Sequence, residues 1–312
     1  MSDSPVNLRQ LEIFRAIMHC RTTVAAAEDL GVSQSAVSNA LKHMESRLGF
    51  RLFERSGNGL VPTEEARILL ETAEPLFLQH NAVKQRAQDL RAGSAGRLRV
   101  VTTAELSVAV LPSVVSAFLA DRPHVQLGID THSLDSVLEM VENGIADIGF
   151  AMEAPQRHGL TFRNLATLRA VCMCPTGHPV ARLDTVTPGN LEGVRLVGPQ
   201  PTSRIGFLVE NAFREASVRY APAVEVRFLN IAARVVEEGF GIGLMDEISA
   251  SFWQTPQVAV MPFAPQVDFA LSAVLPRGRA VAPLAFALAD LFEAEIARRL
   301  DRARRTPPSA AG

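Results

Sequence analysis

The chain has 312 residues, 47% of them hydrophobic and only 6% aromatic, and its formal net charge is −2 at pH 7. This length predicts about two domains, with cores built mainly from aliphatic side chains. The near-neutral charge excludes a polycationic protein that coats DNA, although it leaves room for a local basic face.

The first sixty residues predict three short helices. Asn7 can cap a helix with an apolar stripe, and Thr22 or Thr23 can cap a second helix over "VAAAEDL". Gly31 supplies a left-handed turn, and Ser33 caps a third helix over 34–48. The inward-facing residues predicted for the first and third helices are Leu8, Leu11, Phe14, Ile17, Met18, Val37, Leu41, Met44 and Leu48.

The second and third of these helices have the spacing of a helix-turn-helix motif. Ala27 is small enough for close helix packing, Gly31 makes the turn, and Val37 packs the following helix against the preceding one. The remaining polar side chains are then presented at the start and outer face of the third helix. Recognition helices use such positions to contact base edges and phosphates in the major groove.

The residues predicted to contact DNA in this way are Thr23, Ser33, Gln34, Ser35, Ser38, Asn39 and Lys42. The alternative is a solvated polar helix in an unrelated bundle. A Gly-Asn-Gly turn in "FRLFERSGNGLVPTEEA" then predicts a β-hairpin wing, with Arg51 and Arg55 placed for phosphate or minor-groove contacts. The alternative for both arginines is an ordinary surface position.

A long helix is predicted over 63–92, starting at a Thr63 cap, with a kink or a restart at Pro75. Its apolar positions alternate four and three apart, which predicts a heptad seam between two copies; the alternative is packing on its own domain. The seam residues are Leu69, Ala73, Leu76, His80, Val83, Ala87 and Leu90. Residues 93–96 form a predicted hinge, so that 1–62 is a separate winged helix-turn-helix domain.

From residue 97 the pattern alternates strands with helices, which predicts a parallel α/β domain over 97–300. One sheet is interrupted by a second, giving lobe I over about 97–168 and 268–300 and lobe II over about 169–267. A cleft between two such lobes favours anions, because helix N-termini point into it. Residues 301–312 form a predicted disordered tail. The fold class is therefore α+β and multidomain.

Several kinds of functional site, and a membrane or secreted location, are not expected because their sequence patterns are missing. The chain contains no phosphate loop, no Gly-x-Ser-x-Gly elbow and no His-Glu-x-x-His sequence, so we expect no enzyme, no cofactor and no metal. Cys20, Cys172 and Cys174 are odd in number and lack zinc-site spacing, so we expect reduced thiols. Without a signal core or an apolar run of about 18 residues, a cytoplasmic protein with no membrane contact is expected.

The segment "NLRQLEIFRAIMHCRTTVAAAEDLGVSQSAVSNALKHMESRLGFRLFER" resembles the N-terminal signature of LysR-type transcriptional regulators. The resemblance extends over about residues 6–300. It implies a periplasmic-binding-protein-like effector domain, a homodimer or homotetramer on double-stranded promoter DNA, a ligand-dependent change in DNA bending, and RNA polymerase as a further candidate partner. "RSGNGLVPTEEA", "CPTGHPVA" and "VVEEGFGIGLMD" are similar to the lysine-biosynthesis and opine-catabolism regulators, whose effectors are amino acids or their conjugates.

Carried over by position, the resemblance assigns nine residues to the effector cleft. They are Thr102, Thr103, Glu105, Ser133, Glu153, Thr202, Ser203, Asn230 and Asp246. The four threonine and serine hydroxyls at 102, 103, 202 and 203 are expected to hold a carboxylate, with plain helix capping as the alternative. Glu105 stands where the family often has a small or hydroxyl residue.

Glu105, Glu153 and Asp246 together are therefore expected to receive an ammonium or guanidinium group, with surface solvation as the alternative. This predicts an amino-acid-like effector with one carboxylate and one cationic group, such as a basic amino acid or an opine. The competing function is a cytosolic small-molecule-binding protein or α/β enzyme whose helix-turn-helix makes only protein contacts.

Overall fold

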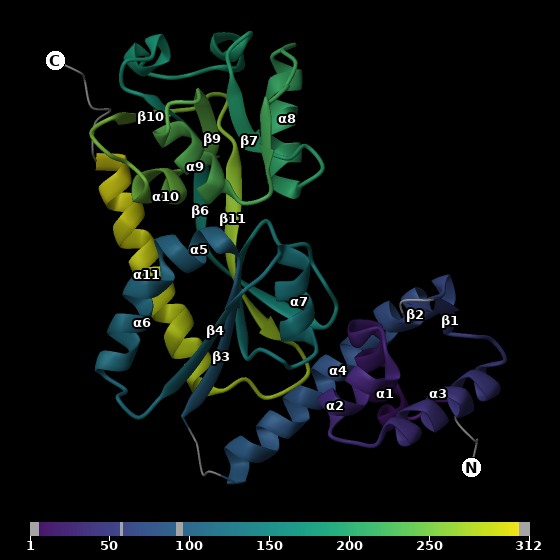
Figure 1. The fold of residues 1–312 in the computed structure, drawn as a ribbon. Helices are drawn as coiled ribbons and strands as arrows, with labels where there is room; N and C mark the ends of the chain where they lie inside the picture. The colour runs from purple at the N-terminus through teal and green to yellow at the C-terminus, as the bar shows by residue number, and fades with distance from the viewer. Residues whose placement is uncertain (1–5, 57–58, 92–95, 306–312) are drawn as a thin grey trace. The chain divides into compact units, whose positions relative to one another are not determined.

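The computed structural model describes residues 6–56, 59–91 and 96–305 (Figure 1). Its contacts divide the chain into two compact units, Met1–Gln85 and Arg86–Gly312, and each unit is considered by itself. The first unit contains α1 (Leu8–Cys20), α2 (Thr23–Leu30), α3 (Gln34–Leu48), β1 (Phe53–Ser56), β2 (Gly59–Pro62) and most of α4 (Glu64–Arg91).

The predicted caps and turn of the helix-turn-helix are confirmed. Asn7 makes a reciprocal capping box with Gln10, Thr22 caps α2, and Ser33 caps α3. Gly31 ends α2 in the left-handed region, with φ 63°. Such a φ strains a residue that has a β-carbon, so this glycine makes the sharp turn between the two helices possible.

A compact apolar core holds the three helices and the wing together. Phe14, Ile17 and Val37 are fully buried in it, as predicted for the inward faces of α1 and α3. The prediction is wrong for Leu8, which is 37% exposed because it is the first residue of α1 and lies at the edge of this core. Glu45 on α3 then fixes the wing, because its Oε1 accepts hydrogen bonds from the backbone N–H groups of Leu52 and Phe53. The predicted hairpin is confirmed, with β1 and β2 antiparallel.

Helix α4 is continuous through Pro75, so the predicted restart there is wrong. Its predicted seam is also divided between two environments. Ala73 is buried in the helix-turn-helix core and Leu69 packs against it, whereas Leu76 and Val83 are 49% and 67% exposed. The side chains of Ala87 and Leu90 lie outside the described part of the structure.

The second unit is the predicted two-lobed α/β domain, but its sheet is mixed and not parallel throughout as predicted. Its elements are β3 (Arg97–Thr102), α5 (Ala104–Ala109), α6 (Leu111–Ala120), β4 (Gln126–Thr131), α7 (Leu134–Glu142), β5 (Ile148–Met152), β6 (Leu160–Pro175), η1 (Pro179–Arg182), η2 (Pro188–Leu191), β7 (Leu196–Pro199), α8 (Arg204–Glu215), β8 (Val224–Val226), α9 (Leu229–Glu237), β9 (Ile242–Asp246), α10 (Glu247–Phe252), β10 (Val258–Pro262), β11 (Asp268–Pro276) and α11 (Pro283–Arg305).

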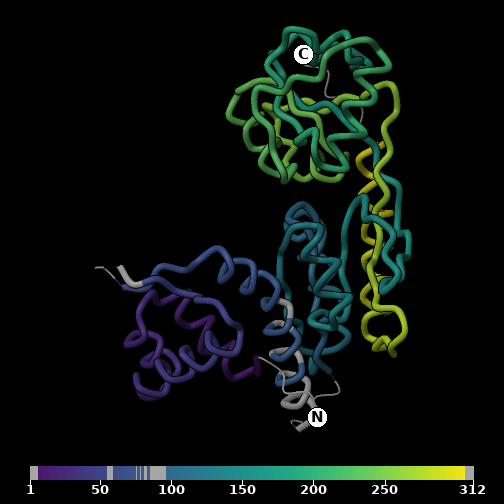
Figure 2. The backbone as a smooth tube through the Cα atoms, turned by 90° about the vertical axis from the view of Figure 1, so that its right-hand side faces the viewer, coloured from purple at the N-terminus to yellow at the C-terminus, as the bar shows by residue number. Residues whose placement is uncertain are grey.

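The strands follow the order β4-β3-β5-β11-β6-β9-β7-β8, and β10 pairs with β6. In lobe I, β3 lies parallel to β4 and β5; in lobe II, β7 lies parallel to β8 and β9. Long antiparallel strands join the lobes, because β6 pairs with β11 on one side of the junction and with β9 and β10 on the other. The ribbon in Figure 1 and the backbone tube in Figure 2 both show the chain passing between the lobes here.

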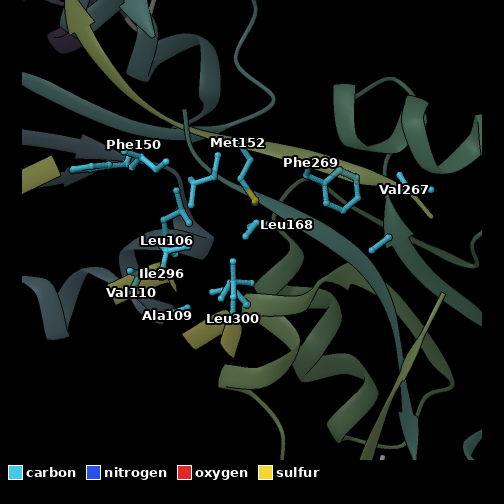
Figure 3. Packing of buried hydrophobic residues seen from close by; sticks show 14 of the residues in the cluster. Leu106, Ala109, Val110, Phe150, Met152, Leu168, Val267, Phe269, Ile296 and Leu300 are labelled. Carbon is cyan, nitrogen blue, oxygen red and sulfur yellow. The ribbon is translucent and has the colours of Figure 1, made fainter. Parts of the chain in front are cut away.

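Helix α11 packs against α6 of lobe I, β6 and α10, so it braces the junction along its length (Figure 2). Figure 3 shows Ile296 and Leu300 of this helix near Leu106 and Ala109 of α5 in the buried core. The helix ends at Arg305, so residues 301–305 do not belong to the predicted disordered tail. The rest of that predicted tail, 306–312, lies outside the described residues.

Candidate functional site

The outer face of α3 carries the side chains predicted to contact DNA. Because Val37, Leu41 and Met44 are buried on the opposite side, the polar residues are left at the surface. Ser33, Gln34, Ser35, Asn39 and Lys42 are exposed, and Thr23 and Ser38 are half-buried. The structure therefore brings together all seven residues predicted on α2 and α3.

Hydrogen bonds between side chains order part of this face. Gln34 Nε2 donates to Thr23 Oγ1 at 3.1 Å and to Ser38 Oγ at 3.0 Å, and the Ser33 and Ser35 hydroxyls lie 3.0 Å apart. A side chain held in this way loses less rotamer freedom when it meets a partner.

The two predicted wing arginines flank this face in sequence. Arg51 is exposed just before β1. Arg55 lies on β1 opposite Leu60, and its side chain is outside the described part of the structure.

A cavity of about 260 Å³ lies at the carboxyl ends of the strands in the second unit. It is lined by Thr103, Glu105, Ser133, Leu134, Asp135, Met152, Glu153, Pro155, Pro199, Gln200, Thr202, Ser203, Arg204, Ile205, Arg227, Phe228 and Leu229. Six of the nine predicted cleft residues are in this lining. Both lobes contribute, which is the arrangement expected of a cleft that closes around a small ligand.

Thr102, Asn230 and Asp246 are not in the lining. Thr102 is fully buried, and its hydroxyl donates to the carbonyl oxygen of Thr103, because the alternation of β3 turns it away from the cavity. Asn230 lies in the first turn of α9 and lines a separate hollow with Trp253. Asp246 is 1% exposed and caps α10, with Oδ1 accepting from the N–H groups of Ile248 and Ser249.

The starts of three helices reach the cavity, which makes part of it favourable for an anion. Ser133 precedes α7, Ser203 precedes α8, and Phe228 precedes α9. The Ser203 hydroxyl is already engaged, since it donates to the carbonyl oxygen of Gln200 and accepts from Gly206 N–H. Thr103 differs, because its hydroxyl is buried and has no hydrogen-bond partner among the described residues.

Of the three acidic residues predicted to receive a cationic group, two line the cavity and the third does not. Glu105 and Glu153 line the cavity, but each already accepts one backbone hydrogen bond, from Leu229 N–H and Ala270 N–H respectively. Burial raises the pKa of Glu105, and the nearby Asp246 raises it further. Burial also raises the pKa of Asp246. Asp246 therefore acts on the cavity through Glu105 and not by lining it.

Two cationic residues of the cavity were missed by the sequence reasoning. Arg204 is the first residue of α8, and Arg227 directly follows β8. Both side chains are exposed at the cavity, and their position after a strand or at a helix start was the only signal in the sequence. Among the described residues, no group of His, Cys, Asp and Glu side chains is arranged to hold a metal ion.

Comparison with known proteins gives the class of this chain. The profile of the bacterial regulatory helix-turn-helix protein, lysR family, matches residues 8–67, and that of the LysR substrate binding domain matches residues 91–297. The chain belongs to the LysR family. It is a DNA-binding transcriptional regulator with an effector-binding domain, and not an enzyme.

Among its relatives is the regulatory protein NocR of Agrobacterium fabrum (strain C58), which is 31% identical over 87% of this chain and 90% of its own length. The octopine catabolism/uptake operon regulatory protein OccR of Rhizobium meliloti is 33% identical over 84% of this chain and 87% of its own. The fold is similar to the crystal structure of the LysR family regulator CbnR, with a TM-score of 0.70 and 21% identity over 93% and 99% of the two chains. In the described residues no helix is both long and apolar enough to cross a bilayer.

Proposed function

We propose that the effector is an amino-acid-like molecule with at least one carboxylate and one cationic group, such as a basic amino acid or an opine. The observation that carries this proposal is the distribution of charge around one small cavity. Arg204, Arg227 and the starts of α7 and α8 are complementary to a carboxylate, while Glu105 and Glu153 each keep a second carboxylate oxygen for an ammonium or guanidinium group. Octopine, which appears in the name of the relative OccR, also carries carboxylate groups and a guanidinium group.

Binding of this effector changes how the regulator holds and bends its promoter DNA. The seven polar residues on α2 and α3 read base edges and phosphates, and Arg51 and Arg55 contact the backbone beside them. The protein acts in the cytoplasm as a homodimer or homotetramer, in which exposed α4 residues such as Leu76 and Val83 form the contact between copies. RNA polymerase is a further partner of the promoter-bound form.

Isothermal calorimetry with arginine, lysine and octopine tests the effector class, with succinate and benzoate as a dicarboxylate and an aromatic acid for comparison. We expect heat of binding only from compounds with both charges. Binding of succinate or benzoate alone would exclude the acidic part of the site. Arg204→Ala should weaken binding of the carboxylate, whereas Arg182→Ala, an exposed arginine outside the lining, serves as the matched control.

A gel shift on the DNA directly upstream of the gene tests the promoter function. We expect a sequence-specific shift that weakens steeply with salt, and a circular-permutation assay should show a different bend angle when the effector is present. A shift with no sequence preference would contradict base readout by α3. An unchanged bend angle would contradict only the proposed response to the effector.

A further inference from the structure

The start of α9 in lobe II is occupied by a carboxylate from lobe I. Glu105 Oε1, on α5, accepts a hydrogen bond of 2.9 Å from the backbone N–H of Leu229, the first residue of α9. The two residues are 124 positions apart in sequence, and they are only 6% and 1% exposed. This contact therefore crosses between the lobes in a buried wall of the cavity.

Helix α9 has no capping side chain of its own. Its N-cap residue is Phe228, which has no oxygen to offer, and no side-chain cap is formed there. The first N–H groups of a helix need an acceptor, and a negative charge at this end is favourable. Glu105 thus does for α9 what Ser203 does for α8, but from the other lobe.

Glu105 is held in this position by its own helix and by the core beneath it. The next residue, Leu106, is 1% exposed, and Ala109 and Val110 are buried in the same cluster as Ile296 of α11 (Figure 3). A buried carboxylate is costly unless it is well compensated, and burial together with the nearby Asp246 raises the pKa of Glu105. The N–H of Leu229 provides compensation that lowers this pKa.

We infer that the Glu105 carboxylate of lobe I serves as the N-terminal cap of α9 in lobe II. This cap joins the two lobes, and it keeps the effector's carboxylate from binding at the start of α9. The effector's carboxylate is thereby directed to Arg204 and the starts of α7 and α8. The inference deepens the proposed function, since it rests on the same cavity receiving the effector. Its structural part, the occupied anion position, does not depend on which effector binds.

Removing the side chain should leave a cavity at α9 that a small free carboxylate can fill. We therefore expect Glu105→Ala in the full-length protein to lower the Tm by about 3 °C, the size expected for a lost helix cap in a domain of this size. Acetate at about 100 mM should restore much of this loss, saturably, while chloride at the same ionic strength and the neutral analogue acetamide should not. Wild type and Glu192→Ala, a surface control, should respond to acetate much less than Glu105→Ala does.

Glu105→Gln keeps an acceptor oxygen for Leu229 N–H and should retain most of the stability. Equal stabilisation of wild type and Glu105→Ala by acetate would overturn the inference, as would an unchanged Tm in Glu105→Ala. If Glu105→Ala does not fold, hydrogen exchange in Glu105→Asp decides, because the shorter side chain draws the carboxylate away from Leu229 N–H. Faster exchange confined to the first turn of α9 supports the inference, and unchanged exchange there overturns it. Because no effector is added, failure of arginine or octopine to bind leaves these readouts unaffected.

Discussion

Gln34 on α3 and Thr23 on α2 are joined by a hydrogen bond of 3.1 Å from the amide nitrogen to the hydroxyl, directly at the face assigned to DNA. The same nitrogen also donates to Ser38. The amide oxygen makes no hydrogen bond among the described residues, so it is the atom available to accept from a base edge. The contact makes Thr23 a supporting residue for Gln34.

Gln34→Ala should reduce discrimination between the operator and a scrambled duplex by about tenfold or more, the value of one good base contact. Thr23→Ala should cause a smaller loss of the same kind, because it frees the glutamine without removing it. Fluorescence anisotropy with both duplexes measures the ratio of affinities. Gln126→Ala, an exposed glutamine on β4, is the matched control. Equal loss on both duplexes would mean that Gln34 supplies only general affinity.

Lys42→Ala should behave differently, because an exposed lysine at this position of α3 is placed for a phosphate. We expect weaker binding to specific and non-specific DNA alike, and a dependence of log affinity on log salt that is less steep by about one. Lys84→Ala, an exposed lysine on α4, should leave the slope unchanged. Arg55→Ala should resemble Lys42→Ala. A loss restricted to the operator would contradict the assignment of Lys42.

Gly206→Ala should disrupt the cavity at the start of α8. A β-carbon added at Gly206 would lie 1.8 Å from the carbonyl oxygen of Gln200, which cannot move without breaking the cap made by Ser203. We expect a loss of about 1–3 kcal/mol in the free energy of unfolding and weaker effector binding, measured by urea denaturation and calorimetry. Gly177→Ala meets no atom within 4 Å and should change neither quantity.

The buried acids Glu105 and Asp246 should make stability fall as the pH rises. Burial raises the pKa of both acids in the folded state above the value in the unfolded chain, so folding is more favourable when they are protonated. Their contribution to stability is therefore fully present at acid pH and is lost as the pH rises above about 4. Asp246→Asn keeps an oxygen to cap α10 but cannot ionise. Its stability relative to wild type should therefore be higher at pH 8 than at pH 5. Urea denaturation at both pH values checks this, with the exposed Asp184→Asn as control. The same difference at both pH values would contradict it.

Leu76→Glu combined with Val83→Glu should dissociate the assembly. Both side chains are exposed on α4 in the isolated chain, so the charges should be tolerated by the monomer but not by an apolar seam between copies. Light scattering should report a lower mass, and the affinity for a two-half-site operator should fall. Lys84→Glu changes the charge next to Val83 without removing apolar area, and should leave the mass unchanged. An unchanged mass in the double variant would place the contact elsewhere.

The fold could be predicted largely because its local signals agree with its packing. Asn7, Ser33 and Gly31 each act within a few residues of their own position, and the spacing of Ala27, Gly31 and Val37 follows from the same short-range geometry. The exception on α4 has a physical reason. A heptad pattern states which side chains share a face, but not that Ala73 meets the core of its own unit while Leu76 stays exposed.

The cavity was less predictable, because contacts there join distant parts of the chain. The sequence placed Thr102 and Asp246 near strand ends, but strand alternation and a local cap turned both away from the cavity. Arg204 and Arg227 were not predicted, because an arginine at the end of a strand or helix is usually a surface residue. Only the folded structure shows that the opposite lobe completes a cavity beside them. No pattern could show that Glu105 would meet Leu229.

The two long strands that join the lobes limit how the regulator can transmit a signal. Of the two, β6 is unbroken from Leu160 to Pro175 and pairs with β11 on the lobe I side of the junction and with β9 and β10 on the lobe II side, so a free swing of lobe II would break backbone hydrogen bonds. Lobe II is therefore expected to move mainly by twisting of β6 at the junction, where its pairing changes from β11 at Arg169 to β9 at Ala170. Occupancy of the cavity is therefore expected to produce a small rotation, which the proposed homodimer or homotetramer would enlarge at the DNA by repeating it in each subunit.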